Sequence, residues 1–220
     1  MLENARYAML FDFDGTITEI DTAEYILDKF TEGDWREPDR LLDQGKITLE
    51  DCMQRQFAMV LVPPETILSE LDKVVKLRPG LTGLMALAME KKMKTYVASA
   101  GLDFVVRHFL KKVELLDSFI LRMGRAVYAH GHLNIEFDPL RHSQAQSFKD
   151  DLVLSIHDQG CKVIYLGDGP PDRRAISLAD LRFAVRGRKL EQYLIEAGLQ
   201  HQSFSDFNEV VSSLKKLTFF

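Results

Sequence analysis

The sequence predicts an α/β fold built on a parallel sheet, with a small helical domain inserted near the N-terminus. Short apolar runs alternate with helical patterns along most of the 220 residues, and most of these runs are followed directly by Asp, Ser or Gly. This alternation is typical of a parallel sheet whose strands are buried on both faces. A hydrophobic content of 46% is sufficient for one sizeable core, or for one domain that carries a smaller inserted one.

Four short apolar runs predict the buried strands of the sheet. They cover residues 7–11, 95–98, 163–166 and 183–185. Helical periodicity precedes the second and third runs, as expected where a helix connects parallel strands. A further stretch, 125–137, alternates around Gly131 and predicts a β-hairpin. We therefore expect residues 1–20 and 79–220 to form a Rossmann-like core that includes this hairpin.

Residues 21–78 interrupt the alternation and predict a helical domain. Nearly sixty residues without a strand signal are too many for a simple connection in a compact domain. Asp21 and Glu24 have the spacing of a capping box, and apolar residues follow them at helical intervals. Thr48 and Asp51 repeat this signal before a second amphipathic stretch. The insert is therefore expected to consist of short helices.

Composition and charge exclude several classes of function. The net charge of −5 offers no basic surface for a nucleic-acid partner. Only Cys52 and Cys161 occur, which fits a reducing compartment and argues against a disulfide or structural zinc scaffold. The first residues lack a signal-peptide pattern, and no apolar run approaches the length of a membrane span. A cytoplasmic protein without a membrane partner is expected, as a monomer or a homodimer.

Polar side chains closely follow the first three predicted strands. They are Asp12, Asp14, Ser99, Asp168 and Asp172. Because ligands of open parallel sheets bind beyond the carboxyl ends of the strands, we expect these side chains to meet in one crevice. Asp12 and Asp14 lie two positions apart, so on an extended chain they point the same way.

The carboxylates expected in this crevice predict a magnesium site. Carboxylates within about 4 Å of one another repel by several kcal/mol per pair at an effective dielectric constant near 20, unless protons or a cation intervene. Mg²⁺ takes few protein carboxylates and shares its coordination shell with phosphate oxygens. Lys149, just before the helix that leads into the third strand, adds a cation. The glycine-rich loops that bind nucleotides are absent from the sequence.

Four motifs, in order along the chain, resemble those of the haloacid dehalogenase superfamily. They read DFDGT (12–16), VASAG (97–101), FKDD (148–151) and GDGPPD (167–172). The resemblance implies that Asp12 attacks phosphorus to form an aspartyl-phosphate. It further implies that Asp14 protonates the leaving oxygen and later activates water, while Ser99 and Lys149 hold the phosphoryl group.

The same resemblance implies a site for Mg²⁺ and a function. The ion would be bound by Asp12, the backbone carbonyl of Asp14 and Asp168, with Asp172 and Thr16 in supporting positions. The expected enzyme is a Mg²⁺-dependent phosphomonoesterase of a small phosphorylated metabolite. The helical insert would then be the cap that closes over the site and selects the substrate.

Substrate recognition is expected from Asp21 and Arg55 in the cap and from Ala100 and Gly101 in the second motif. Asp21 resembles the acid that methionine-salvage phosphatases of 2-hydroxy-3-keto-5-methylthiopentenyl-1-phosphate have at this position. Phosphoserine phosphatases have glutamate there, and an arginine at the position of Arg55. On its helix Arg55 lies about 200° from Met53, off the apolar face, so it faces either a cavity or solvent.

Two departures from the family pattern leave alternatives open. Ala100 places a methyl group where the backbone must approach phosphate closely. Pro170 and Pro171 remove two backbone donors near the substrate. The alternatives to a salvage-type phosphatase are a phosphoserine phosphatase, a phosphomutase that returns the phosphoryl group to an intermediate, and a catalytically silent metabolite-binding protein.

Overall fold

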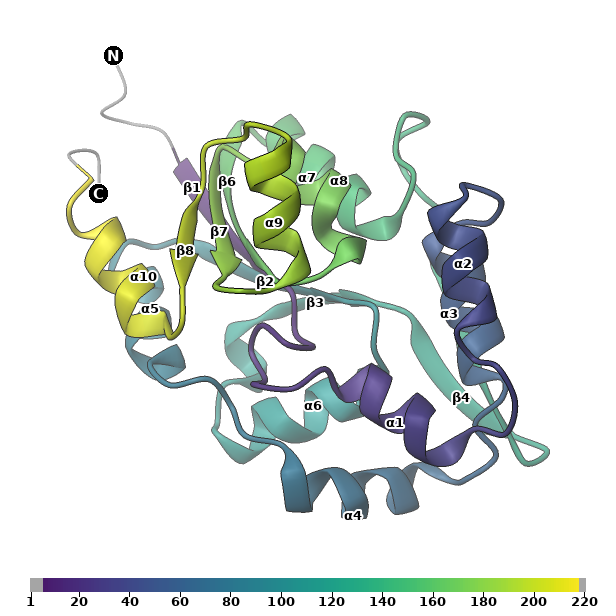
Figure 1. Ribbon diagram of the computed structural model, residues 1–220. Coiled ribbons are helices and arrows are strands. Elements are labelled where there is room, and N and C mark those ends of the chain that lie inside the picture. The colour runs from purple at the N-terminus through teal and green to yellow at the C-terminus, as the bar shows by residue number, and fades with distance from the viewer. Residues whose placement is uncertain (1–5, 218–220) are drawn as a thin grey trace.

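A six-stranded parallel sheet forms the centre of the computed structural model, which describes residues 6–217 (Figure 1). Its strand order is β3-β2-β1-β6-β7-β8, and every neighbouring pair is parallel. The strands are β1 (Arg6–Phe11), β2 (Lys94–Ser99), β3 (Ile120–Met123), β6 (Cys161–Gly167), β7 (Leu181–Val185) and β8 (Gln202–Phe204). The predicted α/β class is confirmed.

The most apolar runs of the sequence form the middle of the sheet. β1 pairs with β6 along its whole length, from Arg6 opposite Cys161 to Phe11 opposite Leu166. The last four residues of β1 are fully buried, because helices cover both faces of a parallel sheet. The four strands predicted from apolar runs are confirmed, whereas the edge strands β3 and β8 were not predicted. Edge strands are partly exposed, so their apolar signal is weak.

Helices cover both faces of the sheet (Figure 1). One face carries α7 (Phe148–Asp158), α8 (Arg173–Leu178) and α9 (Lys189–Glu196), and α5 (Leu81–Glu90) and α10 (Phe207–Leu214) pack together on the other. Outside the insert, the chain also forms α6 (Asp103–Lys112) and the short 3-10 helices η1 (Leu116–Ser118) and η2 (Pro170–Asp172). No helix within residues 6–217 has the length and apolarity that a membrane span requires.

The insert is helical, as predicted, and contains four helices, of which α2 has no side-chain cap and was not predicted. They are α1 (Thr22–Phe30), α2 (Glu37–Asp43), α3 (Leu49–Phe57) and α4 (Pro64–Val74). The Asp21 carboxylate accepts a hydrogen bond from the Glu24 N–H, and Thr48 and Asp51 form a complete capping box. α2 and α3 pack side by side, away from the sheet (Figure 1). The division into a core and a cap at residues 21–78 stays a prediction.

The predicted hairpin is present and contacts the insert. It consists of β4 (Arg125–Ala129) and β5 (His132–Glu136). Its turn places His130 and Gly131 at positive φ, as a two-residue hairpin turn requires. The Gln54 side chain of α3 donates a hydrogen bond of 3.0 Å to the Ile135 carbonyl. The hairpin therefore packs on the helical insert, although the sequence assigned it to the core.

His142 bridges two carboxylates in the loop before α7. Its Nδ1 lies 2.9 Å from Asp151 Oδ1, and its Nε2 lies 2.9 Å from Asp158 Oδ2. Both ring nitrogens can donate to a carboxylate only when the imidazole is protonated. The hydrogen bonds to Asp158 and Asp151 accordingly raise the pKa of His142.

His142→Gln is therefore expected to destabilise the fold more at pH 6 than at pH 8.5. A histidine whose pKa is raised by folding makes its full contribution to stability below its unfolded-state pKa, which is near 6.5. That contribution is lost as the pH rises through the folded-state pKa. Melting temperatures of wild type and variant at both pH values provide the measurement, with His201→Gln as the control because His201 faces a backbone carbonyl. An equal loss at both pH values would contradict the prediction.

Candidate active site

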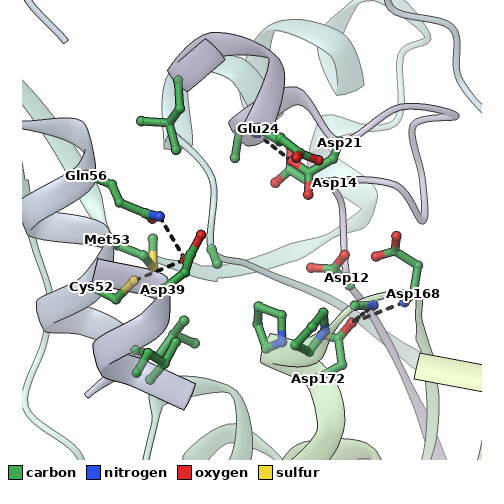
Figure 2. A pocket seen from close by; sticks show the side chains of 18 of the residues that line it. Asp12, Asp14, Asp21, Glu24, Asp39, Cys52, Met53, Gln56, Asp168 and Asp172 are labelled. Atoms are coloured by element: carbon green, nitrogen blue, oxygen red, sulfur yellow. Dashed lines mark hydrogen bonds between the residues drawn. The ribbon is translucent and has the colours of Figure 1, made fainter. Parts of the chain in front are cut away.

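The predicted strand-end side chains meet at one edge of the sheet. Asp12 and Asp14 follow β1, Ser99 ends β2, and Asp168 follows β6. Asp12 is 4% exposed, Asp14 is 7% exposed and Ser99 is fully buried. Figure 2 shows Asp12, Asp168 and Asp172 gathered at one end of a pocket, with Asp14 nearby. The convergence expected from the topology of an open parallel sheet is thus observed.

Three carboxylates form a cluster that could hold a cation. One oxygen from each of Asp12, Asp168 and Asp172 lies within 4.8 Å of the others. Burial, followed by the charge of Asp172, raises the pKa of Asp168 to about 8 and that of Asp12 well above its ordinary value. Burial and mutual repulsion thus disfavour the ionised form of both carboxylates, and a bound cation would offset this cost. An all-oxygen donor set of this kind fits Mg²⁺.

Lys149 supplies the one buried cation of this cluster among residues 6–217. Its Nζ donates to Asp12 Oδ1 at 2.7 Å and to Asp172 Oδ1 at 2.6 Å, and the residue is 1% exposed. Burial alone would lower the pKa of Lys149, but the charges of Asp12 and Asp172 outweigh it and raise the pKa. The ammonium group therefore remains charged and holds the two carboxylates in place.

Asp172 is oriented by hydrogen bonds on both of its oxygens. Oδ1 also accepts from the Tyr165 hydroxyl at 2.8 Å, and Oδ2 accepts from the backbone N–H groups of Asp168 and Gly169 at 3.2 Å. Few lone pairs remain for a metal, so the geometry suits a supporting residue better than a ligand. Tyr165 was not predicted; its only sequence signal is a hydroxyl within the otherwise apolar run 163–166.

Asp14 lies apart from the cluster and faces two hydroxyl groups. Ser99 Oγ donates to its Oδ2 at 2.8 Å, and Thr22 Oγ1 donates to its Oδ1. The Gly101 N–H donates to Ser99 Oγ at 2.8 Å, and a Cβ at position 101 would overlap Asp14. Gly101 therefore makes room for the acid. Thr22 was not predicted, because its contact joins two segments that only the fold brings together.

The turn after Asp14 is held by contacts that the sequence only partly indicates. Thr16 Oγ1 lies 3.3 Å from Asp12 Oδ2 and supports this carboxylate. Gly15 has a φ of +74°, and a Cβ there would overlap Asp168. The guanidinium of Arg78, which was not predicted, donates to the Gly15 and Thr16 carbonyls at 2.7 and 2.8 Å. The end of the insert thereby fixes the loop that carries the two acids.

A cavity of about 250 Å³ extends from the carboxylates into the insert. Asp21 lines it, and burial together with the charge of Asp14 raises the pKa of Asp21 to about 7. Ala100, Pro170 and Pro171 line the cavity from the core side. Arg55 is exposed and is not among the lining residues, so of its two predicted environments the structure shows solvent.

The insert and the core also meet directly beside the lysine. The Glu50 carboxylate of α3 accepts a hydrogen bond of 2.7 Å from the Phe148 N–H at the start of α7. A carboxylate at a helix N-terminus is favoured by the unpaired N–H groups and by the helix dipole. Because Lys149 is the next residue, this contact links the position of α3 to the helix that carries the lysine.

A family model of haloacid dehalogenase-like hydrolases matches residues 9–177, well over half of the chain. The chain belongs to this family. The matched span contains the four motifs and all the residues of the carboxylate cluster. The family resemblance predicted from those motifs is confirmed.

Similar proteins cover nearly the full chain. It is 26% identical to 2-hydroxy-3-keto-5-methylthiopentenyl-1-phosphate phosphatase of Bacillus velezensis, over 95% of this chain and 90% of that protein. It is also 26% identical to a polyol phosphate phosphatase of Saccharomyces cerevisiae, over 96% and 93% of the two chains. One similar solved structure is a phospho-aspartyl intermediate analogue of phosphoserine phosphatase. The superposition includes 96% of this chain and 99% of that one, with a TM-score of 0.69 and 17% sequence identity, which shows a shared fold. The predicted enzyme class, a phosphatase of this family, is confirmed.

Proposed function

We propose that this protein is a Mg²⁺-dependent phosphomonoesterase that acts through an aspartyl-phosphate. One observation carries the proposal. The two acids that lie two positions apart occupy different environments: Asp12 is bonded to the Lys149 ammonium inside the carboxylate cluster, whereas Asp14 faces the Ser99 hydroxyl outside it. Different environments are what a nucleophile and a proton-transferring acid require.

The proposed reaction has two steps. An Asp12 oxygen attacks phosphorus, the bond from phosphorus to the leaving oxygen breaks, and the Asp14 carboxyl gives its proton to that oxygen. Asp14 then takes a proton from a water molecule, which attacks phosphorus and breaks the bond to Asp12. The products are the free alcohol and inorganic phosphate, and both acids return to their starting states.

Mg²⁺ fits the site and would be held by Asp12, the backbone carbonyl of Asp14 and Asp168. When bound, the ion neutralises negative charge on the phosphoryl oxygens. Lys149 would orient Asp12 and stabilise the same oxygens, and the Ser99 hydroxyl would turn from Asp14 toward the phosphoryl group. Asp172 would keep Lys149 in position, as its bond of 2.6 Å already does.

A cavity of about 250 Å³ favours a small metabolite over a peptide or nucleotide substrate. Leu27, Met53 and Phe57 give the part of the cavity formed by the insert an apolar wall. Such a wall suits a methylthio group, so the phosphate ester named for the Bacillus velezensis relative is the first natural candidate.

Phosphate release tests the proposal. Purified protein is assayed with p-nitrophenyl phosphate and a panel of small phosphate esters, including phosphoserine and methylthio-sugar phosphates, in the presence of Mg²⁺ or EDTA. Release that EDTA abolishes and added Mg²⁺ restores is expected. Isomerisation of a sugar phosphate without net release would indicate a phosphomutase. Magnesium binding with neither reaction would indicate a metabolite-binding protein.

A further inference from the structure

The end of the cavity opposite the catalytic acids is formed by Asp39 of α2 and Gln56 of α3. Gln56 Nε2 donates to Asp39 Oδ1 at 2.8 Å, and the Cys52 thiol donates to the same oxygen at 3.4 Å. Burial, followed by the charge of Asp39, raises the pKa of Cys52 to about 12, so the thiol stays protonated. Figure 2 shows these three side chains across the pocket from Asp12 and Asp168.

The hydrogen-bond network shows which atoms of this pair are left without a partner. Gln56 Nε2 also donates to the Trp35 carbonyl at 3.2 Å, so both of its protons point toward acceptors. The amide oxygen Oε1 must therefore point away from these two acceptors. Gln56 Oε1 and Asp39 Oδ2 receive no hydrogen bond from any residue in 6–217, although Gln56 is only 6% exposed and both residues line the cavity. Two residues of the cavity wall thus each keep one acceptor that is available to a ligand.

The charges around this end of the cavity are negative. Asp39 and Asp43 of α2 line it, whereas Asp21 and Glu24 line the cavity beside Asp14 (Figure 2). The two lysines of the lining come from the core: Lys149 is bonded to carboxylates, and Lys189 is exposed at the start of α9. Arg55 points to solvent. A carboxylate on the leaving group would meet like charges here without a cationic partner, which disfavours its binding.

From this arrangement we propose that Asp39 and Gln56 determine specificity by binding hydroxyl groups of the leaving group and by rejecting leaving groups that carry a carboxylate. The inference rests on the proposed phosphomonoesterase function and names its substrate class: phosphate esters of small hydroxylated alcohols. A hydroxyl donates to either free acceptor, whereas a carboxylate cannot donate at all. Sites whose buried polar groups need a partner discriminate strongly against analogues that lack one.

A matched pair of esters tests the inference. Glycerol 3-phosphate and 3-phosphoglycerate differ only in a hydroxymethyl group replaced by a carboxylate. Wild-type kcat/KM is expected to be at least about 30-fold higher for glycerol 3-phosphate. Equal use of the two esters, or use of neither, would overturn the inference. So would a preference for ethanolamine phosphate over glycerol 3-phosphate, because the acids would then select a cation.

Asp39→Asn tests the residue itself. Its amide oxygen would stay with the Gln56 and Cys52 donors, so its NH₂ group would take the place of Oδ2 and present a donor to the cavity. The ratio of the two kcat/KM values is expected to fall about tenfold. Glu37→Gln, an equal charge change at an exposed position of α2, serves as the control and should keep the wild-type ratio. An unchanged ratio in folded Asp39→Asn would overturn the inference.

Two further measurements distinguish a failure of the specificity inference from a failure of folding or of the proposed function. If Asp39→Asn does not fold, Gln56→Met removes the second free acceptor while keeping similar volume, and the same fall in the ratio is expected. Hydrolysis of p-nitrophenyl phosphate by wild type establishes the phosphomonoesterase independently of the leaving group. Its absence would refute the proposed function, whereas its presence without discrimination between the two glycerol esters would overturn only the specificity inference.

Discussion

Asp12→Asn is expected to lower Mg²⁺-dependent phosphate release by at least about 10³-fold. The amide oxygen carries no charge and is a poor nucleophile, so the covalent step is lost. The side chain keeps its shape and still offers Lys149 an acceptor at the position of Oδ1, so the fold should persist. The measurement is kcat/KM for p-nitrophenyl phosphate, with circular dichroism to verify folding.

The control for this variant is Asp117→Asn, the same change at an exposed position outside the site. It should retain wild-type activity. A folded Asp12→Asn protein with more than a tenth of the wild-type rate would contradict the role of Asp12 as nucleophile.

Asp14→Asn separates the roles of the two acids. Loss of general acid and base catalysis costs about 10²–10⁴-fold. Because Asp12 is intact in this variant, an activated substrate such as p-nitrophenyl phosphate, whose leaving group needs little protonation, should lose less activity than an alkyl phosphate. An equal loss for the two substrates would contradict the assignment of Asp14 as the proton donor.

The parts of the fold that the sequence predicts are those whose signal is local. The buried parts of β1 and β6 are apolar runs because helices cover both faces of the sheet there, and the capping box at Thr48 is complete within four residues. β3 and β8 were missed because each is short and partly exposed, so neither pattern stands out from a loop. Their identity as strands comes from pairing with β2 and β7, which no local pattern contains.

The residues of the site also divide into those with a sequence signal and those that only the packed fold brings together. Asp12, Asp14 and Asp168 were predicted because a topological rule places the ends of parallel strands together. Thr22 and Arg78 were not predicted, because their partners lie on loops whose approach depends on the packed fold. The acceptor pair at the far end of the cavity also depends on the pairing of two helices, so only the structure identifies it.

Lys149→Met is expected to destabilise the Mg²⁺-free protein strongly. Removing the buried ammonium leaves Asp12 and Asp172 without their cationic partner. Breaking a buried ion pair by removing one partner costs about 3–5 kcal/mol. For a chain of this size that loss corresponds to a melting temperature lower by roughly 6–20 °C. Phosphate release should also be lost, because Asp12 is no longer oriented.

Mg²⁺ should stabilise this variant more than it stabilises wild type. In wild type the ion would bind a cluster that Lys149 already partly neutralises, so ion and lysine would repel each other and compete for the same carboxylates. Without the lysine the cluster is more negative, and tighter binding to the folded state gives a larger stabilisation at equal Mg²⁺ concentration. Melting temperatures with EDTA and with Mg²⁺ provide the measurement.

Lys111→Met, an equal change at an exposed position of α6, is the control for both effects. It should melt like wild type and respond to Mg²⁺ like wild type. If Lys149→Met instead melts like this control in EDTA, the lysine is not the charge that balances the cluster. A larger Mg²⁺ response in Lys149→Met than in Lys111→Met would mean that lysine and metal neutralise the same carboxylates.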